Sequence, residues 1–183
     1  MKLKVLILCV ISLAASFMAA GIAHAQNKQA QVVLEITRKG VGLTFPLKKQ
    51  VYFRMYEDGR LEYETPPVFD PEAERASFDL VMNETRLEPT VIAELIRIAD
   101  QPGFLAAPDS FKPLHTWVDA AMVTTLVYKH GNKEKRIVIA NYNHKHKEAG
   151  KFYPASLQKL LQRVVELRPK SEEEKVYGTG FLY

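Results

Sequence analysis

The pattern of apolar and polar positions predicts two β-hairpins, each followed by an amphipathic helix. The densest β-branched segment runs from residue 121 to 142 and is interrupted at Gly131-Asn132, a pair suited to the positive φ of a tight turn. This turn gives three direct cross-strand pairs: Lys129 with Glu134, Leu126 with Ile137, and Thr124 with Ile139. Both faces of the hairpin are largely apolar, so we expect it at the centre of the fold with cover on both sides.

A second hairpin is predicted over residues 51–65, and apolar matching selects its register. A three-residue loop Glu57-Asp58-Gly59, with Gly59 left-handed, pairs Met55 with Leu61. A two-residue loop would set Met55 against Glu62, which buries a carboxylate or exposes apolar groups, so we predict the longer loop. Strict alternation then places one polar row on the solvent face: Tyr52, Arg54, Tyr56, Glu62 and Glu64, with Arg54 opposite Glu62 and Tyr52 opposite Glu64.

Two helices are predicted from helical spacing and from proline at their starts. The first begins at Pro89, carries an apolar stripe to Ala99 and ends at 101–103; the second begins at Pro154 and ends near Arg168. A first strand over 31–37 and a short strand over 78–82 complete the predicted elements. We therefore predict an α+β fold, with a single twisted antiparallel sheet of about five to six strands and both helices on one face.

The first 25 residues have the form of a signal peptide. Lys2 and Lys4 precede an apolar run over residues 5–20, and Ala23-His24-Ala25 forms a small-x-small cleavage site. This run is short for a membrane span, which needs about 20 residues, and Cys9 lies at its start, where it would not become an acylated amino terminus. We expect an exported bacterial protein, periplasmic or extracellular, with no transmembrane segment after cleavage.

Cleavage would leave one α+β domain over residues 26–169 and a tail over 170–183. No cysteine follows Cys9, so the domain must be stabilised by a hydrophobic core rather than by disulfides. The tail is acidic and then aromatic, with Tyr177, Phe181 and Tyr183 near its end. It is expected to be either disordered or an edge strand.

Charge is small in total but segregated along the chain. The formal charge of +4 falls to +2 once Lys2 and Lys4 are removed, too little to indicate nucleic-acid binding. Acidic residues dominate positions 57–79, whereas basic residues dominate 129–151. Two interpretations remain open: two solvated faces, or an electrostatic docking surface for a charged partner.

Candidate catalytic and metal-binding chemistry is sparse. His144 and His146 supply two metal ligands, whereas zinc requires three or four held by further partners, and the lysines around them repel a dication. No serine lies in a Gly-x-Ser-x-Gly context. Asp119 directly precedes the central hairpin, where hydrogen bonding to turn amides is the simpler role. We expect no cofactor, no metal and no enzymatic activity.

Several segments together resemble small exported bacterial α+β domains of uncharacterised function and, more faintly, emfourin, a domain associated with inhibition of thermolysin-like metalloproteases. They are Glu57-Asp58-Gly59-Arg60-Leu61-Glu62-Tyr63, Gly103-Phe104-Leu105, Asp119 before a hairpin, and the leucine-rich helix begun by Pro154. The resemblance spans roughly residues 30–168 and implies the fold, but no inhibitory residue. It departs after the first strand, where only Gly40 and Gly42 remain of a glycine-rich segment and the Cys-Pro pairs of some such domains are missing.

Together these features predict an exported, non-enzymatic binding module that docks an unidentified protein partner, in the manner of a protease inhibitor or an accessory protein. The candidate partner-binding residues are Tyr52, Arg54, Asp119, His144 and His146. Two alternatives stay open. The first is a metal-binding protein or enzyme that uses His144 and His146, and the second is an envelope scaffold that acts through its aromatic tail.

Overall fold

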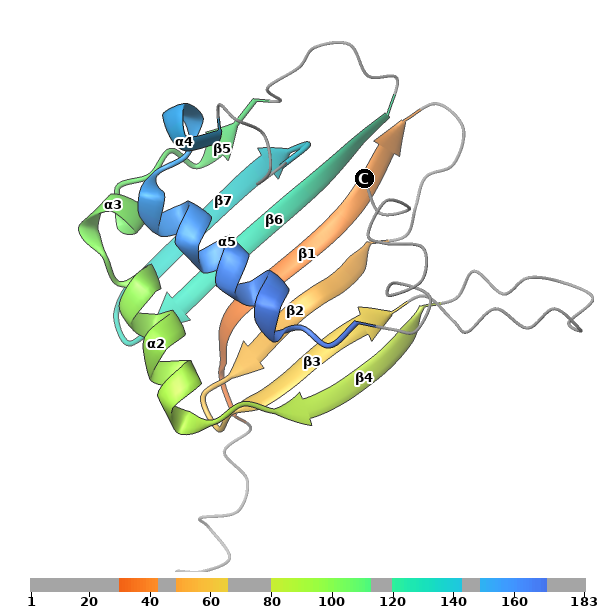
Figure 1. The fold of residues 1–183 in the computed structure, drawn as a ribbon, viewed down its shortest axis with the longest axis vertical. Helices are drawn as coiled ribbons and strands as arrows, with labels where there is room; N and C mark the ends of the chain where they lie inside the picture. The colour runs from red at the N-terminus through yellow and green to blue at the C-terminus, as the bar shows by residue number, and fades with distance from the viewer. Residues whose placement is uncertain (1–29, 43–48, 66–79, 113–119, 143–148, 171–183) are drawn as a thin grey trace, which may run out of the picture. The chain divides into compact units, whose positions relative to one another are not determined.

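The strand β1 (Val32–Gly42) is the central strand of the sheet and is paired antiparallel with β2 (Gln50–Tyr56) on one side and with β6 (Ala120–His130) on the other. β3 (Arg60–Thr65) and β4 (Val81–Arg86) extend the sheet beyond β2, and β7 (Lys133–Ala140) and β5 (Ser110–Phe111) extend it beyond β6. The computed structural model describes residues 30–42, 49–65, 80–112, 120–142 and 149–170. In these, seven strands follow the order β4-β3-β2-β1-β6-β7-β5 (Figure 1).

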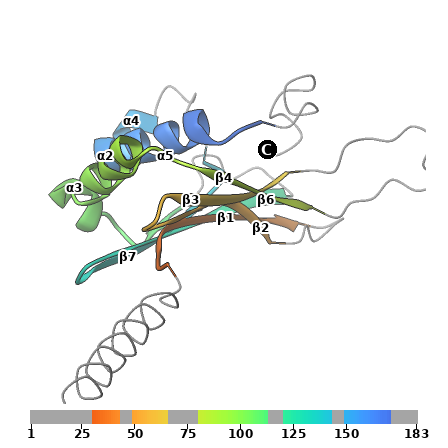
Figure 2. The same cartoon turned by 90° about the horizontal axis from the view of Figure 1, so that it is seen from below.

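The described helices all lie on one face of this sheet, as the edge-on view in Figure 2 shows. They are α2 (Pro89–Ala99), α3 (Pro102–Leu105), α4 (Ala149–Phe152) and α5 (Ala155–Leu167). The sequence prediction of the two longer helices is confirmed, with proline in the first turn of α2 and Pro154 as the residue before α5. We call the sheet face opposite α2 and α5 the outer face.

The core lies between the sheet and the helices. Strand residues that point into it are buried, including Leu34, Ile36, Phe53, Met55, Leu61, Leu126, Ile137 and Ile139. The helices contribute Leu95, Ile98, Leu157, Leu160 and Val164. Burial of one such side chain contributes about 1.5–3 kcal/mol, so packing of α2 and α5 fixes which strand residues face inward.

The sheet differs from the predicted one in strand count and in direction. It has seven strands, and β5 runs parallel to β7, so the prediction of about five to six strands, all antiparallel, is wrong. β5 is only two residues long, too short to produce a periodic signal. It is held in place because Lys135 on β7 binds the carbonyl of Ala107 and the carboxylate of Asp109. The short strand near residue 80 also starts later than predicted, at Val81.

Both hairpin turns have the predicted register. Met55 pairs with Leu61 and Arg54 with Glu62 across the loop that ends at Gly59, which has a φ of 86°. In the central hairpin Leu126 pairs with Ile137, Thr124 with Ile139 and Lys129 with Glu134. The expected cover on both sides is not found among the described elements, which pack on one face, and Val127 and Val138 on the outer face are half-buried.

A buried tyrosine joins the helices to the central hairpin. The Tyr128 hydroxyl donates to Asp100 Oδ1 at 2.7 Å, and Lys133 Nζ lies 2.8 Å from Asp100 Oδ2. Burial and this hydrogen bond raise the pKa of Tyr128. Burial alone would raise the pKa of Asp100, but the hydrogen bonds from Lys133 and Tyr128 outweigh it and lower that pKa. The carboxylate therefore links the end of α2 to β6 and β7.

We predict that Gly59→Ala destabilises the protein more than Gly131→Ala. Both residues have positive φ, so alanine costs about 1–2 kcal/mol of backbone strain at either position. Only at Gly59 would the new Cβ also lie 3.0 Å from Ile92 Cδ1 and from the Leu87 carbonyl oxygen, which adds about 1–3 kcal/mol of overpacking. Urea unfolding of both variants checks the order, and equal losses would contradict the steric argument.

We predict that Tyr128→Phe lowers the free energy of unfolding by about 1–3 kcal/mol, because Asp100 loses a buried hydrogen-bond donor. Tyr63→Phe is the matched control, since within the described part of the chain the Tyr63 hydroxyl makes no hydrogen bond. Thermal and denaturant unfolding of both variants give the comparison. A Tyr128→Phe protein as stable as the control would show that the link to Asp100 contributes nothing.

Candidate functional site

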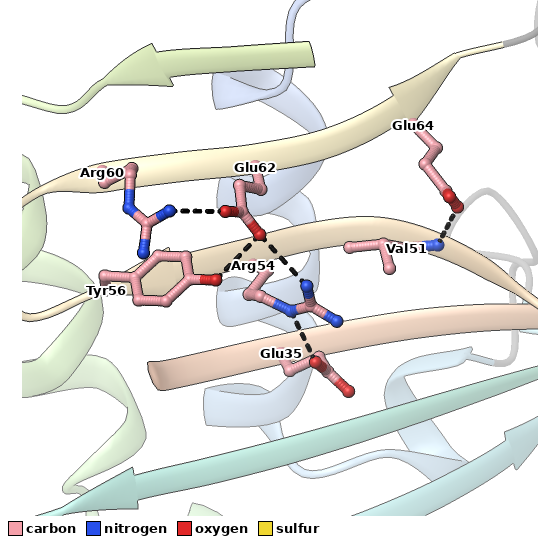
Figure 3. A network of polar contacts seen from close by, with 7 residues as sticks. All are labelled: Glu35, Val51, Arg54, Tyr56, Arg60, Glu62 and Glu64. Atoms are coloured by element: carbon pink, nitrogen blue, oxygen red, sulfur yellow. Dashed lines mark hydrogen bonds and ion pairs between the residues drawn. The ribbon is translucent and has the colours of Figure 1, made fainter. Parts of the chain in front are cut away.

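A network of paired charges occupies the outer face of β1, β2 and β3. Glu35, Arg54 and Glu62 are direct partners across these three strands, and directly opposed residues share one face of a sheet. Figure 3 shows their side chains in front of the strands with the helices behind. We define the Arg54 network as Glu35, Arg54, Tyr56, Arg60 and Glu62.

Arg54 joins the three strands through its planar guanidinium group. Its Nε donates to Glu35 Oε2 at 2.7 Å, and its Nη1 donates to Glu62 Oε2 at 3.0 Å. The side chains of Arg54 and Glu35 are 26% and 24% exposed, and that of Glu62 is 15% exposed. Two carboxylates on opposite sides therefore hold the rigid fork of Arg54 in one orientation.

Glu62 accepts hydrogen bonds from three side chains. Besides Arg54, the Tyr56 hydroxyl donates to Oε2 at 2.8 Å, and Arg60 Nη1 donates to Oε1 at 2.7 Å. The Arg60 guanidinium also stacks over the Tyr56 ring, with 3.7 Å between Cζ and the ring centroid. This cation–π contact covers the ring, so Tyr56 is only 8% exposed even though it lies on the outer face.

Arg54 and Glu62 both keep their charges at neutral pH. Burial would raise the pKa of Glu62, but hydrogen bonds from Tyr56 and Arg54, together with the charge of Arg60, lower it overall. Burial would lower the pKa of Arg54, but Glu35 and Glu62 raise it overall. Burial and Glu62 both raise the pKa of Tyr56. Two cations and two anions therefore balance on a preordered surface.

The network is the middle of a longer row of side chains across the outer face. On one side Glu62 pairs with Glu84 of β4; on the other, Glu35 pairs with Val127 of β6, which pairs with Arg136 of β7. Glu84 and Arg136 are exposed, whereas the residues between them are half-buried. The row thus has a fixed centre and two solvent-exposed charges of opposite sign.

Tyr52 is not part of this row, so its predicted place on the solvent face is wrong. Ile36 pairs with Phe53 and Thr37 with Val51, which leaves Tyr52 as the extra residue of a β-bulge. Such a bulge turns two consecutive side chains to the same side, and Tyr52 is 5% exposed within the core. Its ring is stacked with two arginines, at 3.5 Å from Arg38 Cζ and 4.6 Å from Arg168 Cζ.

The bulge also separates the ends of β2 and β3, whose ladder stops at Arg54 and Glu62. Side chains replace the missing backbone pairs. Gln50 Nε2 and Arg168 Nη2 donate to the Glu64 carbonyl oxygen at 2.9 and 2.8 Å, and the Val51 N–H donates to Glu64 Oε2 at 2.5 Å. Arg168 follows α5 directly, so this cluster fixes the end of that helix on the sheet.

Of the five candidate partner-binding residues, the structure places Arg54 at the centre of the charged row and Tyr52 in the core. Asp119, His144 and His146 lie outside the described residues. Local pattern did predict the pairing of Arg54 with Glu62, but it missed Glu35 and Arg60 as partners. Glu35 could not be found that way because the register between β1 and β2 has no short turn to fix it.

Comparison of the sequence with protein-family models and with curated proteins finds no match. Within the described ranges, no group of three or more His, Cys, Asp or Glu side chains is arranged to hold a metal ion. Among the helices described, none combines the length and apolar character needed to cross a lipid bilayer.

We predict that Glu62→Gln lowers the free energy of unfolding at pH 7 by about 1–3 kcal/mol, because charge-assisted hydrogen bonds are lost. The pKa of Glu62 in the folded protein lies below its ordinary value of 4.5. Its contribution to stability is therefore complete above pH 4.5 and is lost as the pH falls through the folded value. The difference between wild type and variant should shrink on acidification.

Denaturant unfolding from pH 7 down into the acid range measures this difference. Glu57→Gln is the matched control, because Glu57 is exposed in the loop of the same hairpin and makes no ion pair in the described part of the chain. The control should follow the wild type at every pH. A wild-type advantage over Glu62→Gln that stays constant with pH would contradict the assignment.

Proposed function

We propose that the protein is an exported, non-enzymatic binding module that docks a protein partner on its outer face, around the Arg54 network. The observation that supports this most directly is that the arginine side chains of the charged row are held in fixed orientations. Arg54 is held by two carboxylates, and Arg60 is held by Glu62 and Tyr56. Binding to such a surface loses little side-chain entropy, which is the main benefit of preorganisation.

The composition of this face suits a protein partner. Arginine and tyrosine are enriched among residues that contribute most to protein interfaces, and the Arg54 network holds two arginines and a tyrosine. Half-buried β-branched residues continue the face over β6 and β7, at Val127, Thr125 and Val138. The apolar area would contribute affinity for a partner, and the fixed charges would set the register in which the partner docks.

The protonation of the network favours binding over catalysis. A general acid needs a carboxyl group with a raised pKa, and a pair of catalytic carboxyls needs values that are pushed apart. The pKa of Glu62 is instead lowered, by hydrogen bonds from Tyr56 and Arg54 and by the charge of Arg60. Glu62 therefore serves as an acceptor that orients arginines.

We predict that a photo-crosslinking residue at position 136 or 39 captures the same protein partner in cells of the source organism. Arg136 is the exposed end of the charged row on β7, and Lys39 is exposed on β1, on the same face as Glu35 by strand alternation. The matched control is position 159, which is exposed on α5 and should give no such adduct. The resemblance to emfourin makes a purified thermolysin-like metalloprotease the first defined partner for the same assay.

Adducts of identical mass at positions 136 and 39 would support docking on the outer face. Adducts confined to position 159, or equal capture at all three positions, would overturn it. Arg54→Met should lower the yield at both outer-face positions, because the partner would meet a disordered pair of carboxylates.

A further inference from the structure

Among the strands that the structure describes, β4 forms one edge of the sheet, and its outward backbone groups can be assigned. The Leu87 N–H donates to the Gly59 carbonyl oxygen at 2.9 Å, so this pair of the β3–β4 ladder is hydrogen-bonded. Hydrogen-bonded pairs alternate with non-hydrogen-bonded ones in antiparallel strands. With Leu61 opposite Thr85 and Tyr63 opposite Asn83, the N–H and C=O groups of Met82, Glu84 and Arg86 therefore point away from β3.

Both charged residues of β4 face a like charge on β3. Arg86 lies directly opposite Arg60, and Glu84 lies directly opposite Glu62; like charges in direct opposition destabilise a sheet. Arg60 and Glu62 are bound to each other within the Arg54 network. Glu84 and Arg86 are both exposed, and neither makes an ion pair in the part of the chain that the structure describes. The edge strand thus carries, on one face and two positions apart, two charges of opposite sign that have no ion-pair partner among the described residues.

This edge is self-complementary when two copies are paired antiparallel about Thr85. In that register Glu84 of each copy lies directly opposite Arg86 of the other. These are also residues whose backbone groups point outward, so each pair can exchange two backbone hydrogen bonds as well as an ion pair. The two copies of Thr85 meet at the axis, and a cross-strand threonine pair is favourable. Backbone and side-chain complementarity therefore select the same register.

Neighbouring two-fold registers lack this match. A register about Glu84 opposes the two Glu84 carboxylates, and a register about Arg86 opposes the two Arg86 guanidinium groups, so both cost free energy. A register about Asn83 sets Met82 opposite Glu84 and Leu80 opposite Arg86, which leaves every charge uncompensated. Of these four registers, only the one about Thr85 opposes unlike charges.

We infer that two copies of this chain pair along β4, with the two-fold axis at Thr85, to form a dimer with one continuous sheet. The paired segment is residues 83–87, and beyond it the chain leaves the sheet to begin α2 at Pro89. The contact is a sheet edge, distinct from the proposed docking surface on the outer face. Because the two-fold axis is perpendicular to the sheet, both outer faces of the dimer point in the same direction.

Paired charge reversals test the register. Glu84→Arg alone would set an arginine opposite Arg86 of the other copy at both ends of the interface. Arg86→Glu alone would set a glutamate opposite Glu84 of the other copy in the same way, so each variant should be monomeric. Each reversal also replaces a like-charge pair with β3 by an unlike one, so neither variant should lose its fold. An equimolar mixture should dimerise, because two arginines of one chain then face two glutamates of the other.

Sedimentation velocity over a wide dilution series measures the two variants, their mixture and the wild type, with circular dichroism as the check on folding. The double variant Glu84→Arg/Arg86→Glu should dimerise on its own, because the two charges are exchanged and still oppose each other. Lys159→Glu on α5 is the matched charge-reversal control and should dimerise like the wild type.

Glu84→Pro is a further variant that acts on the backbone. It removes an N–H that points away from β3, where proline is tolerated in an edge strand, so the folded protein should be monomeric. A wild type that stays monomeric at every concentration would overturn the proposal. Single charge reversals that dimerise like the wild type, or a mixture that stays monomeric, would overturn it equally.

Discussion

Burial of one face of the sheet under α2 and α5 is the constraint on which the rest of the structure depends. It forces apolar residues into alternate positions along every long strand, as Leu34, Ile36, Leu126 and Ile137 show. The positions between them must then suit a half-exposed surface. Charges there are costly unless they are paired and hydrogen-bonded, and the Arg54 network meets that requirement across three strands.

The alternation is broken at Tyr52, and the break has structural consequences at some distance. The extra residue turns Tyr52 into the core and moves the end of β2 away from β3. Arg168 enters this gap, donates to the Glu64 carbonyl and stacks on Tyr52. The bulge is therefore the place where the last turn of α5 is joined to the sheet.

Much of the fold and half of the charged site were predictable, because short-range rules decide them. Apolar matching across a three-residue loop set Met55 opposite Leu61 and, with it, Arg54 opposite Glu62. The central position of β1 was not predictable, because no tight turn connects β1 to its partner strands. The pairing of Glu35 with Arg54 could therefore not be predicted either. A bulge of one residue gives no periodic signal, which is why Tyr52 was misplaced. Predictions on residues 119, 144 and 146 lie outside the described residues.

The double pairing of β1 also bears on how the chain folds. Its partner β2 begins at Gln50, soon after β1 ends at Gly42, whereas Val127 of β6 pairs with Glu35 only after most of the chain has been made. Contacts of such high sequence separation slow folding, because the entropy of closing the loop is lost before the strand pairing contributes any favourable free energy. During synthesis from one end to the other, β1 therefore waits longest for its second partner, and the sheet is completed only when the central hairpin has been made.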